Sequence, residues 1–136
     1  MPAPTTPAGR DDRGAAVVEF TLVSILLVSL FLMILQVGLV LHTRNVMVAA
    51  AQEGARLAAN ADRTEADGVA RTREALRGSL GADLLARTEV APAGRSATPG
   101  GAPVVGIRVS GPLPFLFVPV GPLRITVTGH ALDEGR

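Results

Sequence analysis

The sequence predicts an α+β fold, in which a long N-terminal helix packs on a small antiparallel β-sheet. Three observations support this fold class. An uncharged apolar run extends from Phe20 to Leu41, alanine-rich sequence continues its helical pattern, and apolar residues alternate with polar ones near the C-terminus. The first half of the helix is therefore expected to cross a membrane, and the rest of the chain is expected to form one folded domain.

The composition excludes several functional classes. The chain has 136 residues with 13 basic and 12 acidic side chains, and this balance argues against nucleic acid as a partner, because such binders need a basic surface. Cysteine is absent, which excludes thiolate metal sites, cysteine nucleophiles and disulfides. Only two histidines are present, so a histidine-rich metal centre is excluded as well. We expect no catalytic residue, no metal site and no cofactor.

The apolar run has the length of one membrane crossing. As a helix, Phe20 to Leu41 spans about 33 Å, against roughly 30 Å for the hydrocarbon core of a bilayer. A buried core helix is one alternative, but the rest of the chain is too small to surround an apolar helix of this length. A cleaved secretory signal is another, although its apolar region is typically about 7–15 residues. Arginines flank both ends of the run, so charge does not settle the orientation.

Glu19 stands at the entry of this helix, where a lone carboxylate is unfavourable. One interpretation places its side chain among the lipid headgroups, where it is solvated. The other gives it a cationic partner on another chain. Cleavage after Gly14 would create such a cation, because Ala15 would then carry a free ammonium. Glu19 of a neighbouring helix, displaced by about one turn, could pair with that ammonium.

Beyond the membrane, the helix is expected to continue from Thr43 to about Asn60. Small residues recur there at four-residue spacing, which reflects either close packing against a neighbouring element or simple helix propensity. The two stripes are Ala50, Gly54 and Ala58, and Ala51, Ala55 and Ala59. Glu53 and Arg56 are expected to form an ion pair within the helix.

A second helix is expected from Glu65 to about Leu80. Thr64 and Asp67 fit a capping box at its start, and Gly81 is expected to end it. Its apolar face holds Val69, Leu76 and Leu80, and its solvated face holds Arg71, Arg73, Glu74 and Arg77.

Period-two alternation predicts two strands after a flexible loop from Ala91 to Pro103. The apolar side of these strands is formed by Val105, Ile107 and Val109, and by Leu123, Ile125 and Val127. A shorter strand is expected from Arg87 to Ala91. The connection from Gly111 to Pro122 is uncharged and rich in proline, which argues against a regular strand. Its apolar residues, Phe115 to Val118, either pack under the sheet or contact a partner subunit or the membrane surface.

The segment that leads into the apolar run resembles a known processing motif. RGAAVVEF is similar to the class III prepilin-like motif of Tad (tight adherence) pilins, which has a glycine, four variable residues, a glutamate and an aromatic residue. Here these are Gly14, Ala15 to Val18, Glu19 and Phe20. The sequence AAAQEGARLAA, from Ala49 to Ala59, also resembles the TadE-like minor pseudopilins. The resemblance covers Arg13 to about Ala59, and the C-terminal strands match only in pattern.

The resemblance implies processing by a dedicated prepilin peptidase on the cytoplasmic face. It makes Gly14 and Ala15 the scissile pair, and Glu19 and Phe20 the residues of assembly. Residues 1–14 would be a leader, residues 15–42 a transmembrane helix and residues 43–136 an extracytoplasmic α+β domain of pilin-like plan. The chain would cross the cytoplasmic (inner) membrane once, with its N-terminus in the cytoplasm. Its partners would be the membrane, the peptidase, other pilin or pseudopilin subunits and Tad assembly proteins.

Two departures bear on the class of pilin. The major Flp pilins often carry tyrosine where this chain has Phe20, and they are usually much shorter, so the minor TadE-like class fits better. Pseudopilins of type II secretion and type IVa pilins typically begin with phenylalanine after the cut, whereas this chain would begin with Ala15.

The leading hypothesis for function is therefore a non-enzymatic structural subunit, a minor pseudopilin in the biogenesis of a Tad or Flp-type type IV pilus. A second hypothesis is a single-pass membrane-anchored binding module with no processing. A third is an enzyme that uses His130, Asp133 and Glu134, but no nucleophile or glycine-rich phosphate loop lies near them in the sequence. His130 is better explained as a strand residue that faces solvent.

Overall fold

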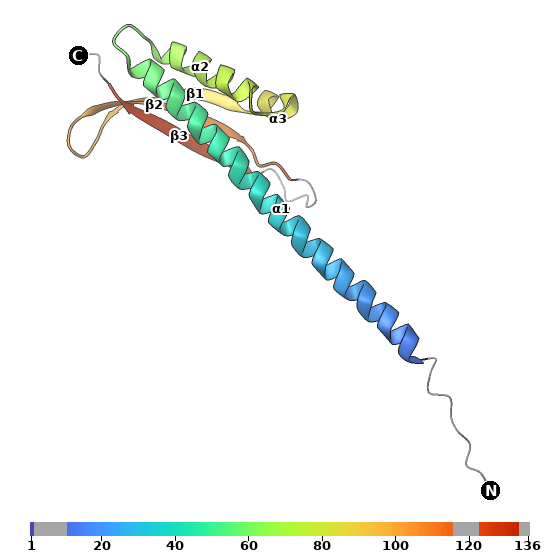
Figure 1. Cartoon of the computed structure of the whole chain (residues 1–136). Helices are drawn as coiled ribbons and strands as arrows, with labels where there is room; N and C mark the ends of the chain where they lie inside the picture. Colours follow the sequence, from blue (N-terminus) through green and yellow to red (C-terminus); the bar gives the residue numbers. More distant parts are fainter. Residues whose placement is uncertain (2–10, 116–122, 134–136) are drawn as a thin grey trace. The chain divides into compact units, whose positions relative to one another are not determined.

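The computed structural model describes residue 1, residues 11–115 and residues 123–133. In chain order, its elements are α1 (Asp11–Ala59), α2 (Glu65–Arg77), α3 (Ala82–Ala86), β1 (Glu89–Ala97), β2 (Pro103–Pro112) and β3 (Arg124–Leu132) (Figure 1). The chain divides into two compact units, Met1–Val37 and Gly38–Arg136. A long apolar helix whose C-terminal part packs on a three-stranded antiparallel sheet confirms the predicted α+β fold.

The first unit contains the N-terminal part of α1. Over residues 14–37 no side chain is buried, although the apolar segment has a mean hydropathy of 2.7. Phe20 is 74% exposed and Phe31 is 64% exposed. An apolar helix that exposes its side chains in this way suits a lipid environment and argues against the buried-core alternative. Within it, the Thr21 hydroxyl donates to the carbonyl of Val17 at 2.8 Å. This hydrogen bond satisfies a hydroxyl group that would find no acceptor in lipid.

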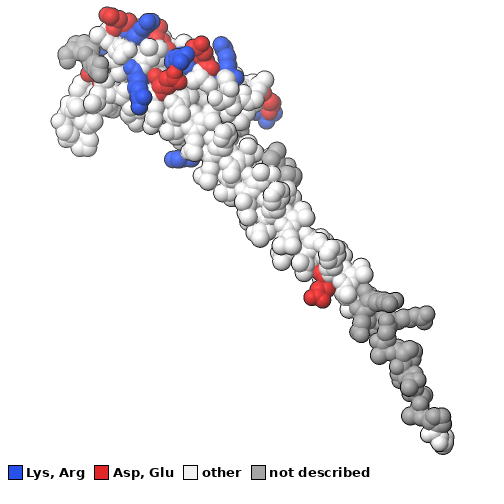
Figure 2. Space-filling view, viewed as in Figure 1, with Lys and Arg blue, Asp and Glu red and all other residues white. Residues whose placement is uncertain are grey.

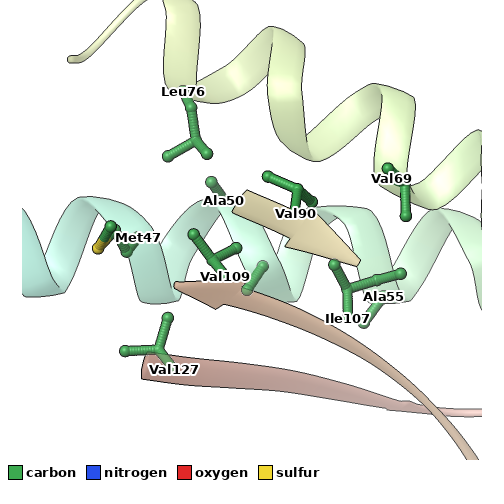
Figure 3. Close-up of a cluster of buried hydrophobic side chains, with 10 residues drawn as sticks. Met47, Ala50, Ala55, Val69, Leu76, Val90, Ile107, Val109 and Val127 are labelled. Carbon is green, nitrogen blue, oxygen red and sulfur yellow. The ribbon is translucent and has the colours of Figure 1, made fainter. Parts of the chain in front are cut away.

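The second unit is built around one face of the sheet. The strand order is β1-β2-β3 with antiparallel pairing throughout, and the C-terminal part of α1 and α2 pack on the same face (Figures 1 and 3). The core cluster consists of Met47, Ala50, Ala51, Ala55, Val69, Leu76, Val90, Ile107, Val109 and Val127. Burial of this apolar surface is the main stabilising contribution to the unit.

The alanine and glycine stripes of α1 are packing surfaces. Their members are buried, and they face the sheet and α2. A Cβ placed on Gly54 would overlap Oγ1 of Thr72 in α2, and a Cβ on Gly68 of α2 would lie 2.6 Å from the Gly54 carbonyl oxygen. Close approach to a neighbouring element, one of the two readings of these stripes, is therefore correct.

Helix α2 begins as predicted and ends earlier. The Thr64 N–H donates to Oδ2 of Asp67 at 2.9 Å, and the Asp67 N–H donates to Oγ1 of Thr64 at 3.2 Å, so the predicted capping box is confirmed. The helix ends at Arg77 with Gly78 as its C-cap. Gly81, which was expected to end α2, instead caps the N-terminus of the short helix α3, which the sequence analysis did not predict.

The prediction of a flexible loop from Ala91 to Pro103 is wrong except for residues 98–102, which connect β1 to β2. Strand β1 continues to Ala97 and pairs with β2 through most of that range. A register shift between Pro92 and Gly94 marks a bulge, and Gly94 takes a positive φ of 85° there. Because β1 is an edge strand and carries a bulge at this point, proline and glycine are compatible with the strand.

The predicted alternation in β2 and β3 is largely confirmed. Val105, Ile107 and Val109 are all fully buried, and Val127 is 7% exposed. Leu123 precedes β3 and is 50% exposed, so it does not share the buried face. Strand β2 extends through Gly111 and Pro112 into the predicted connection. The predicted apolar patch from Phe115 to Val118 lies outside the described residues except for Phe115, which is half-buried.

Candidate processing and assembly site

The predicted scissile pair lies in the first turns of α1. The helix begins at Asp11, and Gly14 and Ala15 are both exposed. A Cβ placed on Gly14 would meet no atom within 4 Å. The first four N–H groups of a helix have no partner within it, and glycine has a low helix propensity. The bond between Gly14 and Ala15 therefore lies where unwinding the helix for a peptidase breaks few hydrogen bonds.

Glu19 lies one helical turn from Ala15. Residues four apart occupy the same side of a helix, and here they are separated by about 6 Å along the axis. The Glu19 side chain is exposed, and the described residues offer it no ion pair. Phe20 follows it and is 74% exposed. The structure thus brings the Ala15 backbone and the Glu19 carboxylate onto one side of the helix.

Glu19 is the only charged residue between Gly14 and Thr43. Figure 2 shows one acidic group on this part of α1 among uncharged side chains, whereas charged groups are numerous on the second unit. An ionised carboxylate costs on the order of 2.5–3.5 kcal/mol at the centre of a membrane helix and less towards its end. A carboxylate at this depth therefore favours contact with a cation or with water.

The start of α1 suits a pairing of the Glu19 carboxylate with a cation. A helix N-terminus carries the positive end of the helix dipole, so an ammonium at Ala15 would be unfavourable without a nearby anion. A carboxylate from an adjacent helix would stabilise both groups, each of which is costly alone in a low dielectric. The arrangement can therefore support a charge pairing between helices.

A second cluster of charge joins α1 to α2. Nε of Arg71 donates to Oε1 of Glu53 at 2.9 Å, and Nη1 of Arg71 donates to Oε2 of Glu74 at 2.9 Å. The hydrogen bond to Glu53 and then that to Glu74 raise the pKa of Arg71. The predicted pair of Glu53 with Arg56 is therefore wrong, because Glu53 binds a residue distant in sequence. These side chains are largely exposed, which makes the cluster a surface contact of modest strength.

Of the three residues of the enzyme hypothesis, the structure describes His130 and Asp133. His130 is exposed on β3, Oδ2 of Asp133 lies 3.5 Å from Nε of Arg95, and Glu134 lies outside the described residues. A surface pocket of about 420 Å³ does adjoin His130, with Arg56 and Asn60 on its other side. Within the described residues, no group of histidine, aspartate and glutamate side chains could hold a metal ion.

Sequence reasoning missed the contacts that position α2. Gly68 gives α1 room to approach, and the hydroxyl of the buried Thr72 donates to the Gly68 carbonyl at 2.9 Å. Nη2 of Arg73 donates to the Val90 carbonyl at 3.2 Å, which ties α2 to β1. A glycine inside a helical pattern was the one available signal for this close packing.

Comparison with known proteins supports the reading of the N-terminal half. Residues 14–56 match the family model described as TadE-like protein. The match begins at the predicted scissile glycine and ends in the alanine-rich part of α1. It confirms the resemblance seen in the residues and indicates a protein associated with the Tad pilus. No curated protein and no solved structure matches the chain.

Proposed function

We propose that this chain is a minor pseudopilin, a structural subunit that takes part in building a Tad or Flp-type pilus. The observation that carries the proposal is the exposed Glu19, one helical turn from Ala15 and the one charged residue of α1 between Gly14 and Thr43. The match of residues 14–56 to the TadE-like family supports it. A single apolar helix at the N-terminus also fits a protein anchored in the membrane by one crossing.

In this proposal a prepilin peptidase cuts the chain after Gly14 on the cytoplasmic side. The N-terminus faces the cytoplasm, α1 crosses the inner membrane, and residues 43–136 form the extracytoplasmic domain. The exposed position of Gly14 near the start of α1 supports access by a peptidase. Before the cut, the membrane helix keeps the subunit stored in the bilayer.

Cleavage then creates the charge that selects processed subunits. The new ammonium on Ala15 meets the Glu19 carboxylate of a neighbouring subunit, and Phe20 lies beside this pair on the apolar side. Because an unpaired Glu19 is unfavourable in lipid, association of processed subunits lowers the free energy of both. An unprocessed subunit offers no ammonium at Ala15 and gains nothing from the contact. The role is structural, with no catalytic residue and no cofactor.

A second candidate is an unprocessed membrane-anchored binding module. The observation that favours it is the surface pocket of about 420 Å³ between α1 and β3, which Arg56 and His130 help to line. This candidate predicts that residues 1–14 remain on the chain and that Glu19 is solvated among lipid headgroups.

A pair of glycine variants separates the two candidates. Gly14 and Gly38 both lie in α1, and a side chain at either would meet no atom within 4 Å. We expect Gly14→Val to block processing and fail to restore pili, counted by electron microscopy, in cells that lack this chain. Gly38→Val should restore them as the unchanged chain does. Full restoration of pili by Gly14→Val would overturn the pseudopilin proposal and leave the anchored module.

A further inference from the structure

We propose that one end of the sheet rests on the membrane surface, with Leu113, Phe115 and Leu123 in contact with lipid where the apolar run of α1 ends. This inference concerns the second unit alone, which contains residues 38–59 of α1 together with the sheet. It depends on a membrane crossing by α1 but not on cleavage or on pilus assembly.

The direction of the sheet along α1 follows from contacts at successive positions. The C-terminal residues of α1 and of β3 line one pocket. Nearer the middle, a Cβ on Gly129 of β3 would overlap the backbone of Ala51. Further towards the N-terminus of α1, a Cβ on Gly111 of β2 would lie 2.6 Å from Cε of Met47. The end of the sheet where β2 finishes and β3 begins therefore lies towards the N-terminal end of the part of α1 that belongs to this unit, residues 38–59.

The strand pairing continues past the level of Met47. The Leu113 N–H donates to the Leu123 carbonyl at 2.9 Å, beyond the last paired residues of β2 and β3. Two strand residues rise about 6.6 Å, which matches about four residues of a helix. This places Leu113 and Leu123 beyond Met47, in the direction of Thr43. Thr43 is only 3% exposed, so the domain packs against α1 at least as far as this residue.

The apolar run ends immediately before that level. Leu41 is its last residue, and only His42 separates it from the buried Thr43. The chain therefore has no polar stalk between the membrane-spanning part of α1 and the domain. We therefore place this end of the sheet at the lipid–water boundary.

The side chains at this end suit contact with lipid. The sequence carries no charge from Gly111 to Leu123. Leu123 is 50% exposed, and Leu113 and Phe115 are half-buried. The opposite end of the sheet is polar, with Arg95 beside Glu65 and Asp133. Lipid is the occupant that these observations favour, because this uncharged end of the sheet lies on the side of α1 where the apolar run ends, and it needs no second protein to cover it.

Single tryptophans test this placement, because the chain contains no tryptophan of its own. The full chain is reconstituted in phosphatidylcholine vesicles whose lipids carry bromine near the top of the acyl chains, a quencher of tryptophan emission. Phe115→Trp reports on the proposed contact. Leu132→Trp, at the other end of β3 and 60% exposed, is the matched control. Phe31→Trp, inside the apolar run, checks that α1 is inserted.

We expect brominated lipid to quench Phe115→Trp and Phe31→Trp, relative to vesicles without bromine, and to leave Leu132→Trp unchanged. Phe115→Trp should also emit at shorter wavelength than Leu132→Trp. Circular dichroism of each variant verifies that the fold is retained. Quenching of Phe115→Trp no stronger than that of Leu132→Trp would overturn the proposal. If iodide in the water also failed to quench the emission of Phe115→Trp, residue 115 would be covered by a protein contact and not by lipid. Absence of quenching for Phe31→Trp would contradict the membrane crossing by α1, on which the proposal depends.

Discussion

Gly54 of α1 and Thr72 of α2 lie so close together that a methyl group on Gly54 would overlap the threonine hydroxyl. That hydroxyl is itself buried and donates to the Gly68 carbonyl at 2.9 Å. The same methyl group would also lie 2.6 Å from the Gly68 carbonyl oxygen. The two helices therefore meet backbone to backbone, and α2 is held over the sheet by the absence of a side chain at two positions.

The first prediction concerns this contact. Gly54→Ala should destabilise the second unit by about 1–3 kcal/mol, because the added methyl group must displace buried backbone. The better helix propensity of alanine offsets roughly 1 kcal/mol at most. Urea unfolding of the full chain in detergent, followed by circular dichroism, measures the change. Gly81→Ala is the control, since Gly81 has a φ of −61° and open space around its Cβ position. Equal stability of the two variants would show that the helices adjust to the methyl group.

The second prediction concerns the charge on Glu19. Glu19→Gln keeps the size of the side chain but removes the anion that the Ala15 ammonium needs, so pilus number should fall strongly. Thr21→Val is the control, because it also alters a polar group near the start of the apolar run, one that bonds only to its own helix. The N-terminus of each variant is determined as well, which separates an assembly defect from a processing defect. Normal pilus numbers with Glu19→Gln would exclude the pairing.

The third prediction concerns acid stability at the start of α2. Hydrogen bonds from the backbone and then the side chain of Thr64 lower the pKa of Asp67 from its ordinary value of 3.8. A carboxyl whose pKa is lower in the folded state stabilises the fold above its unfolded pKa, and this contribution is lost as the pH falls through the folded-state pKa. The stability difference between the unchanged chain and Asp67→Asn should therefore shrink as the pH falls below about 4. A difference that is constant with pH would contradict the assignment.

Thr64→Val provides a check on the cause. It removes the side-chain hydrogen bond to Asp67 and leaves the backbone donor in place. The acid-dependent loss of stability should then be smaller and be complete at a higher pH than in the unchanged chain, because the folded-state pKa of Asp67 moves back towards its ordinary value. An unchanged loss would show that the backbone N–H alone sets the titration.

Local signals in the sequence were sufficient for about half of the fold. The apolar run, the capping box of Thr64 and Asp67, and the alternation around Ile107 each depend on neighbours within a few residues, and each is confirmed. Strand β1 was largely missed because Pro92 and Gly94 are typical loop residues. They are tolerated only because β1 has a partner on one side, which is a fact of topology.

The candidate site divides in the same way. Ala15 and Glu19 are four residues apart on one helix, so their shared face followed from helical geometry alone. Arg71 is distant from Glu53 in sequence, and no periodicity pairs them. The nearer Arg56 was the better expectation from local rules, and tertiary packing of α2 on α1 overrides it. The position along α1 of the sheet end near Leu123 likewise could not be predicted from local rules, because it depends on contacts between the strands and the helix.

The most direct test of the processing claim is the N-terminal residue of the chain extracted from membranes. Mass spectrometry of the intact protein and of its N-terminal peptide identifies that residue without any mutation. Our account predicts that the chain begins at Ala15 and that this form is missing from cells without the prepilin peptidase. A chain in assembled pili that still carries residues 1–14 would contradict the account, since no ammonium would then be present at residue 15 for Glu19 to bind.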